Sequence, residues 1–156
     1  MADKTMTIVV GSDHAGFPLK GKILEALKAA KYDVLDVGSY DDAPVDFPDI
    51  ASQVTDAILS KRATRGIMVC GTGVGAAIAA NKVPGIRAAV CHDVHSAHQS
   101  VEHDDVNVMC IGAQIVGAWL AVDLVEVFLK ARFNATEDHR RRVAKLHEMD
   151  GALARR

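Results

Sequence analysis

The sequence predicts an α/β protein with a doubly wound, Rossmann-like domain, a five-stranded parallel sheet and an extra C-terminal helix. Short β-rich runs alternate with stretches in which apolar residues recur every third or fourth position. The strand runs are apolar throughout, as expected for parallel strands that are covered on both faces. A chain of 156 residues suits one domain, so we expect a single domain over 1–156.

Five strands and the helices between them follow in order along the chain. The expected strands are Met6–Gly11, Tyr32–Val37, Gly66–Cys70, Ile86–Cys91 and Val106–Ile111. The expected helices are marked by Leu19, Ile23 and Leu27, by Ile50, Val54 and Ile58, by a short stretch ending near Asn81, by Val116–Phe128 and by a charged tail at 137–153. The tail has few apolar positions, so we expect it to pack on a partner subunit rather than on its own core.

Composition excludes several classes of protein. The net charge of -2 leaves no electrostatic footprint for nucleic acid or an anionic membrane. Three cysteines make no secreted disulfide framework, which favours a reducing compartment. No run reaches about 18 apolar residues, and the N-terminus lacks the layout of a signal peptide. We therefore expect a cytoplasmic protein with a small-molecule substrate and neither nucleic-acid nor membrane partners.

Polar and titratable residues gather around the strand ends, where doubly wound sheets bind ligands. Ser12–Gly16 follow the first strand, Cys70–Gly75 the third, and His92 and Asp93 the fourth. We group Glu102–Asp105, which precede the fifth strand, with them and expect all of these groups to crowd one edge of the sheet.

The segment Gly71-Thr72-Gly73-Val74-Gly75 joins a strand to a helix. Its glycines let backbone N–H groups converge on a phosphate or a developing oxyanion, although a plain tight turn is the simpler alternative. No Gly-Lys-Ser/Thr follows, so this is no nucleoside-triphosphate loop. With Ala76, and Asp93 roughly 20 residues on, the segment also fits a dinucleotide fingerprint. That fingerprint normally follows the first strand, and the chain is short for an added catalytic domain.

Cys70 ends an apolar strand beside this loop. A helix N-terminus would lower its pKa and make it a usable base, whereas the alternative is a small core residue. Cys91 and Cys110 are expected in the core. Asp13 and His14 could open a sugar ring or bind hydroxyls, or could be an N-cap and a surface imidazole; His103 is similar. The three histidines at 92, 95 and 98 do not share one helix face, so we expect no metal site.

Taken together, four segments closely resemble ribose-5-phosphate isomerase B, in a family that also includes the galactose-6-phosphate isomerase subunits. The matching segments are Gly11–Gly16, Cys70–Gly75, Ala79–Lys82 and Gly85–Ala88, and the resemblance runs from about Thr7 to about Val143. It implies an aldose-ketose isomerase of carbohydrate metabolism that needs no cofactor or metal. It also implies homodimers, often tetramers, whose active sites draw on both chains.

The resemblance also implies roles for individual residues. Cys70 would be the base, and Thr72 with the glycine loop (Gly71, Gly73, Val74 and Gly75) would stabilise an enediolate. Asp13, His14 and His103 would bind the sugar and help to open its ring. Asp104 and Arg142 would complete substrate binding.

Four positions depart from the family pattern. Asp104 stands where Asn is usual, and Phe47 where Tyr is usual. Gln114 and Asp138 replace two arginines that commonly hold the phosphate, while Arg142 is kept. On a helix, Asp138 could pair with Arg142. These departures leave the preferred sugar open among ribose 5-phosphate, allose 6-phosphate, galactose 6-phosphate, a tetrose phosphate and a free aldose. A nicotinamide dinucleotide-binding domain and a non-catalytic sugar-phosphate sensor are the remaining alternatives.

Overall fold

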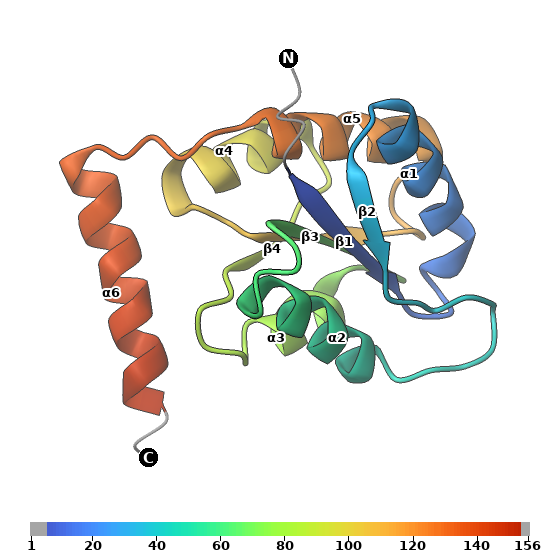
Figure 1. The fold of residues 1–156 in the computed structure, drawn as a ribbon, viewed down its shortest axis with the longest axis horizontal. Helices are drawn as coiled ribbons and strands as arrows, with labels where there is room; N and C mark the ends of the chain where they lie inside the picture. The colour runs from blue at the N-terminus through green and yellow to red at the C-terminus, as the bar shows by residue number, and fades with distance from the viewer. Residues whose placement is uncertain (1–5, 154–156) are drawn as a thin grey trace.

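The computed structural model describes residues 6–153 and contains a five-stranded parallel sheet in the order β2-β1-β3-β5-β4 (Figure 1). The strands are β1 (Thr7–Ser12), β2 (Asp33–Asp36), β3 (Arg65–Cys70), β4 (Ala88–Val90) and β5 (Val108–Gly112). The helices are α1 (Phe17–Ala29), α2 (Phe47–Leu59), α3 (Val74–Ala80), α4 (Val94–Asp104), α5 (Ala118–Lys130) and α6 (Glu137–Leu153). The expected α/β class, parallel sheet and extra C-terminal helix are confirmed.

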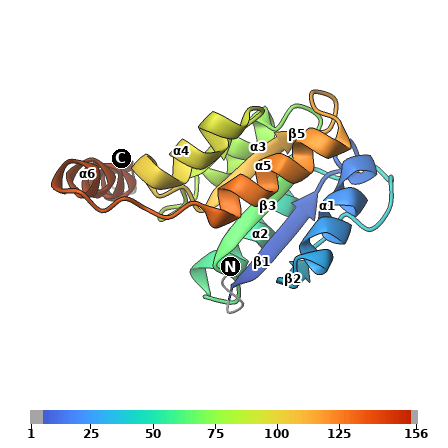
Figure 2. The ribbon, with the colours of Figure 1, turned by 90° about the horizontal axis from the view of Figure 1, so that it is seen from above.

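Two apolar layers explain why the strands read as apolar throughout. Ile8, Ile67 and Met109 pack with α1, α4 and α5 on one face of the sheet. Their strand neighbours Val9 and Met68 pack with α2 and α3 on the other face. Figures 1 and 2 show the sheet lying between these two helical layers. Because consecutive strand residues point to opposite faces, burial on both faces demands an unbroken apolar run.

The C-terminal helix α6 stands apart from these layers (Figures 1 and 2). The segment 131–136, which contains no helix or strand, leads to it from α5. Val143 is buried, but most α6 side chains are exposed, as its few apolar positions predicted. Among the described residues, no helix has the length and apolar character needed to cross a membrane.

Candidate active site

The sheet changes winding direction at β1, because β2 lies on one side of it and β3 on the other. Ligands of doubly wound sheets bind outside the carboxyl ends of the strands at such a switch point. Asp13 follows β1, and Cys70 is the last residue of β3. The parallel register pairs Ser12 with Val69, so Asp13 and Cys70 emerge side by side.

Asp13 and Cys70 are in direct contact. The Cys70 thiol donates a hydrogen bond to Asp13 Oδ2 at 3.0 Å, and the Gly16 N–H donates to Asp13 Oδ1 at 2.8 Å. Both side chains are buried, with Asp13 5% and Cys70 8% exposed. At Gly16 a Cβ would lie 2.0 Å from the Val69 carbonyl oxygen, so glycine is required for this turn to reach β3. The carboxylate is thus fixed against the thiol from two sides.

The environment of Cys70 corrects one sequence-based expectation, because the pKa of its thiol is raised rather than lowered. Burial is the largest cause, followed by the hydrogen bond to Asp13 and the charge of that carboxylate. The backbone N–H groups of Gly73 and Gly71 act in the opposite direction but are outweighed. Cys70 is therefore a protonated thiol at neutral pH when the site is empty.

The segment Gly71–Gly75 forms a cradle of backbone amides above Cys70. Gly73 has a φ of +79°, a left-handed conformation that strongly favours glycine, and it caps the N-terminus of α3. The amides of Gly71 and Gly73 both interact with the Cys70 sulfur. Thr72 and Val74 are exposed, so the cradle is open to solvent on its outer side.

Residues after β5 also line this region; the sequence analysis noted Gln114 only as a departure from the family pattern and missed Ala113. The N–H of Ala113 donates to the Cys70 carbonyl oxygen at 2.8 Å, and the N–H of Gln114 donates to the Gly71 carbonyl oxygen at 3.0 Å. Gln114 Oε1 lies 3.3 Å from where a Gly71 Cβ would be. The rule that directs attention to the carboxyl ends of strands applies equally to β5 and would have found them.

His14 and Phe47 form the rim of the site. His14 is exposed, and its Nδ1 accepts a hydrogen bond from the Val45 N–H at 3.3 Å. The Phe47 ring, at the start of α2, lies 2.9 Å from where a Gly75 Cβ would be. The first contact holds the loop before α2 beside His14, the neighbour of Asp13. The second holds the start of α2 beside Gly75 of the cradle.

His103 and Asp104 do not join this site, contrary to the expectation that they share its edge. They end α4 and precede β5, which places them at the amino-terminal edge of the sheet. The Asp104 carbonyl oxygen accepts a hydrogen bond from Arg87 at 3.2 Å, and Arg87 directly precedes β4. In a parallel sheet, residues before a strand and residues after one lie at opposite edges.

His103 instead lies against α6. Its ring stacks on His139 with the centroids 4.5 Å apart. Arg142 is exposed on the same helix. Asp138, which the sequence would allow to pair with Arg142, forms its ion pair with Arg141 at 2.6 Å. That contact and the Arg141 charge lower the pKa of Asp138.

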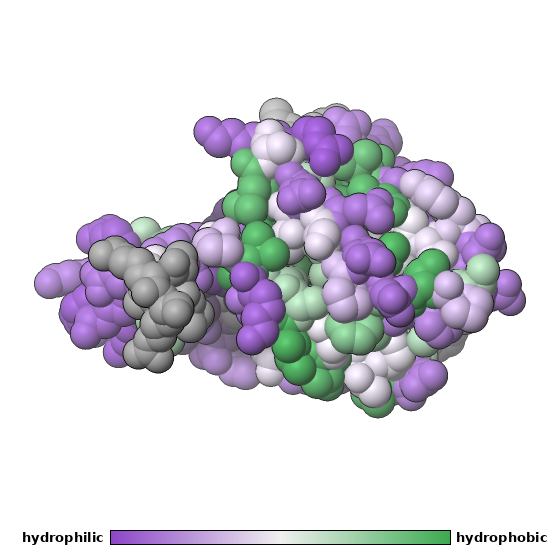
Figure 3. Space-filling view, turned by 90° about the horizontal axis from the view of Figure 1, so that it is seen from below, coloured by the Kyte–Doolittle hydropathy of each residue, from purple (hydrophilic) through white to green (hydrophobic). Residues whose placement is uncertain are grey.

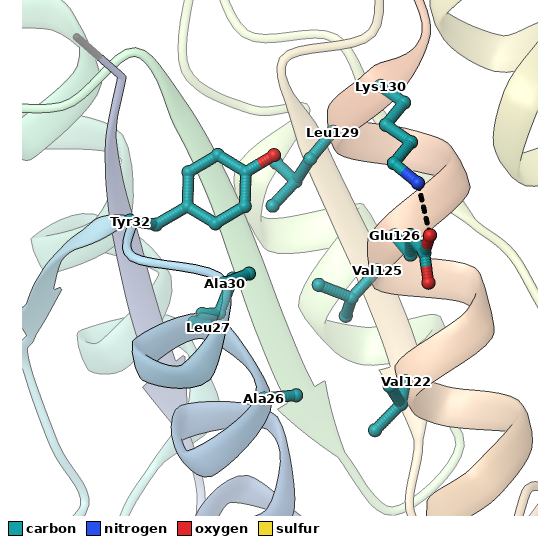
Figure 4. A pocket seen from close by; sticks show the side chains of 9 residues that line it. All are labelled: Ala26, Leu27, Ala30, Tyr32, Val122, Val125, Glu126, Leu129 and Lys130. Carbon is teal, nitrogen blue, oxygen red and sulfur yellow. Dashed lines mark hydrogen bonds and ion pairs between the residues drawn. The ribbon is translucent and has the colours of Figure 1, made fainter. Parts of the chain in front are cut away.

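Two further features lie outside the site. A cavity of about 230 Å³ between α1 and α5 is lined mainly by aliphatic side chains, with Tyr32 and the Glu126–Lys130 ion pair at its side (Figure 4).

No group of three or more His, Cys, Asp or Glu residues that could hold a metal occurs within the part of the chain that the structure describes. Asp93, which the dinucleotide fingerprint would use, accepts a hydrogen bond from the Ser96 N–H at 2.7 Å and caps α4.

Comparisons with known proteins agree with this architecture. A family model described as Ribose/Galactose Isomerase matches residues 8–146. Ribose-5-phosphate isomerase B of Escherichia coli K12 is 42% identical over 136 residues, which is 87% of this chain and 91% of that protein. Galactose-6-phosphate isomerase subunit LacB of Clostridium acetobutylicum is 35% identical over 144 residues, 92% of this chain and 83% of that one. The structure of Clostridium thermocellum ribose-5-phosphate isomerase B superposes with a TM-score of 0.93 at 45% identity, covering 95% of this chain and 99% of that one.

The fold, the site and these comparisons define the class of this protein as an aldose-ketose isomerase, an intramolecular oxidoreductase. The chain belongs to the ribose/galactose isomerase family, and the resemblance to ribose-5-phosphate isomerase B is confirmed.

Proposed function

We propose that this enzyme interconverts ribose 5-phosphate and ribulose 5-phosphate by proton transfer through a cis-enediolate, without a cofactor. The observation that carries the proposal is the contact between the Cys70 thiol and the Asp13 carboxylate, 3.0 Å long, beneath the amide cradle of Gly71–Gly75. This contact supports the proposal, because a carboxylate able to take up a proton and backbone amides able to meet an oxyanion lie beside the same sulfur. We also propose a cytoplasmic location, where a reducing environment keeps Cys70 a free thiol.

Cys70 acts as the base in this proposal. Asp13 takes up the thiol proton, and the resulting thiolate removes the proton from C2 of the open-chain aldose. The electron pair of that C–H bond forms the C1–C2 double bond of the enediolate, and negative charge develops on the C1 oxygen. A proton then moves from the C2 hydroxyl to the C1 oxygen, and return of the proton from Cys70 to C1 gives the ketose with its carbonyl at C2, while Asp13 returns its proton to the sulfur. A positioned general base contributes on the order of 10²–10⁴ in rate.

The amide cradle stabilises the enediolate. The amides of Gly71 and Gly73 face the Cys70 sulfur. The substrate carbon that gives its proton to this sulfur must lie near the same amides. These amides therefore stabilise the neighbouring substrate oxygen as it becomes negatively charged. Donors of this kind favour the transition state over the substrate, and the loss of one typically costs roughly 10²–10³ in rate. Thr72, exposed within the cradle, supplies a hydroxyl to the same oxygen region. His14 would bind the sugar at the rim.

The preferred sugar is the least constrained part of the proposal, because relatives act on both pentose and hexose phosphates. Gln114 lies beside Gly71, where an arginine would offer a charge to phosphate. We therefore propose that ribose 5-phosphate is accepted but that another sugar, such as allose 6-phosphate or a tetrose phosphate, is turned over better.

The deciding experiment measures kcat/KM of the dialysed enzyme for ribose 5-phosphate, allose 6-phosphate, galactose 6-phosphate, erythrose 4-phosphate and free ribose. Turnover of ribose 5-phosphate supports the reaction, and the ranking gives the substrate. No isomerisation of any of these sugars, with a binding signal from sugar phosphate, would favour the sensor alternative. A fluorescence change on adding NADH would favour the nucleotide-binding alternative.

We further propose a homodimer in which each site is completed by His103, Asp104 and Arg142 of the second chain. Within one chain these residues lie at the edge of the sheet opposite Cys70 or on α6. Besides the buried Val143 and the stacked His139, α6 contacts its own body through polar groups, Arg87 with His147 at 3.1 Å and the Gly85 N–H with Asp150 at 2.9 Å. A cavity of about 430 Å³ remains between α6 and the edge strand β4.

Exposed apolar side chains on α3, on the edge strand β4 and at the start of α4 have the composition of an interface. Val74, Ile78 and Val94 are 51%, 57% and 45% exposed, and Val90 of the edge strand is also exposed. Figure 3 shows hydrophobic residues gathered on the underside of the molecule beside α6. A second copy packed there would bury these side chains and bring its own α6 alongside.

Mixing two inactive variants tests the shared site. Random pairing of Cys70→Ala with Arg142→Ala subunits makes half of the dimers mixed, and each mixed dimer has one intact site. Activity should recover to about a quarter of wild type. No recovery, with mixed dimers demonstrated by mass spectrometry, would show that each chain uses its own Arg142. Light scattering of the wild type distinguishes a dimer from a tetramer.

A further inference from the structure

The His92 side chain accepts a hydrogen bond from β5 at a position where a longer β4 would supply a backbone carbonyl oxygen. β4 pairs with β5 only as far as Val90, opposite Cys110, and the Cys91 N–H adds a bond to the Cys110 carbonyl oxygen at 3.1 Å. β5 continues to Gly112 after β4 has ended. The Gly112 N–H donates to Nε2 of His92 at 2.9 Å. The imidazole thus supplies the hydrogen-bond acceptor that the buried Gly112 N–H requires and that β4 does not provide at this position.

Gly112 is in turn the support of the amide cradle. A Cβ at Gly112 would lie 2.8 Å from both Cα and C of Thr72, so the cradle backbone passes directly over Gly112. The two residues that follow it are bonded to the Cys70 and Gly71 carbonyl oxygens at 2.8 and 3.0 Å. A displacement of Gly112 is therefore passed directly to Thr72 and its neighbours, because closely packed backbone cannot yield.

We propose that His92 is a positioning residue for the isomerase reaction: by accepting the Gly112 N–H it fixes the end of β5 and, through it, the amide cradle. The inference rests on the roles proposed for Cys70 and Gly71–Gly75. It requires that Nε2 carries no proton, so His92 is neutral with the proton on Nδ1. His92 touches no reacting atom; its effect on rate passes through the backbone that binds the enediolate oxygen.

The proposal separates His92 from the other histidines of this region. His95 and His98 are exposed on α4, and His98 pairs with Glu102 at 3.5 Å. Only the ring of His92 bonds to β5 among the described contacts of these three. His95→Leu is the matched control, because it removes an imidazole three residues further along the chain, on α4, without touching β5.

Two substitutions at His92 test the proposal. His92→Leu keeps an apolar side chain of similar size but removes the acceptor, and His92→Gln places an amide oxygen near the position of Nε2. We expect His92→Leu to lower kcat by roughly tenfold to a hundredfold with KM changed less than about threefold, since a misplaced cradle weakens the transition state rather than the substrate. His92→Gln should recover most of kcat, and His95→Leu should match wild type.

A second measurement follows the cradle without any sugar. The amides of Gly71 and Gly73 favour the Cys70 thiolate, so a displaced cradle should move the pH midpoint of Cys70 alkylation by iodoacetamide upward. The midpoint should rise in His92→Leu and return toward wild type in His92→Gln. If the cradle did not bind the enediolate, this midpoint would still shift while turnover did not, which separates failure of the proposed mechanism from failure of this inference.

The inference is overturned if His92→Leu keeps wild-type kcat and an unshifted alkylation midpoint, or if it loses only thermal stability. It is also overturned if folded His92→Gln is as slow as His92→Leu. Should His92→Leu fail to fold, His92→Gln and His92→Asn form the comparison. The shorter Asn side chain places its oxygen nearer to the position of Nδ1, so it should not restore kcat or the midpoint.

Discussion

The carboxyl edge between β1 and β3 and the far end of α4 both carry groups suited to sugar chemistry, yet they are built differently. At the first, Asp13 and Cys70 are buried and bonded to each other at 3.0 Å. At the second, His103 is partly exposed and stacks on His139 of a helix that stands apart from the body. The first region is complete within one chain, whereas the second presents its side chains outward. In the homodimer proposed above, enolisation would belong to one chain, and ring opening and substrate binding to its partner.

The largest expected effect comes from the buried region. Cys70→Ala should lower kcat by at least roughly two orders of magnitude while leaving the fold intact, because it removes the proposed base. Circular dichroism and steady-state kinetics measure the two quantities. Cys110→Ala, a change at a fully buried core thiol, is the control and should cost thermal stability with little change in turnover. Near-normal turnover by Cys70→Ala would remove Cys70 from the mechanism.

The outward-facing region should affect ring opening more than enolisation. His103→Ala should lower kcat by roughly tenfold or more on ribose 5-phosphate, a loss at the low end of general acid-base catalysis. Erythrose 4-phosphate cannot form the same ring, so its turnover should fall much less. Equal losses on the two sugars would place His103 in the enolisation step instead.

The pH dependence examines the buried pair itself. Since burial and Asp13 raise the pKa of the Cys70 thiol above its usual 9.0, the thiolate fraction at neutral pH is small and grows with pH. Iodoacetamide alkylation should therefore rise about tenfold per pH unit until the pH passes that raised value. Asp13→Asn removes the hydrogen bond and the charge, so it should lower the midpoint. It should also slow turnover, because the proton acceptor is lost. An unchanged midpoint would show that Asp13 does not control the thiol.

The smallest expected effect concerns Gln114, which lies beside the amide cradle, and Asp138 on α6. Gln114→Arg with Asp138→Arg adds two cations and frees Arg141 from its ion pair. KM for ribose 5-phosphate should fall several-fold to about tenfold, since each charged hydrogen bond to phosphate contributes about 1.5–3 kcal/mol and solvent screens part of it. Free ribose, which carries no phosphate, is the control substrate. A wild-type KM already below millimolar, with no gain in the double variant, would contradict this interpretation of Gln114 and Asp138.

Much of the first region could be predicted from sequence, and little of the second. Unbroken apolar runs give β1 and β3, and the switch-point rule then brings Asp13 to Cys70. The same reasoning fails for His103, because a residue before a strand was grouped with residues after strands. The thiol pKa was expected in the wrong direction because its largest cause, burial, depends on packing from several elements. The bond from Gly112 to His92 joins residues 20 apart and leaves no local pattern.

The raised pKa of Cys70 has a consequence for the lifetime of the enzyme. Peroxide and other oxidants attack the thiolate far faster than the thiol. A site that keeps the Cys70 sulfur protonated against Asp13 therefore reacts slowly with oxidants. In the proposed mechanism, the thiolate arises only while a proton is being transferred. In the proposed mechanism, burial and the hydrogen bond to Asp13 make Cys70 a reluctant base between turnovers, and the same two causes protect it from overoxidation.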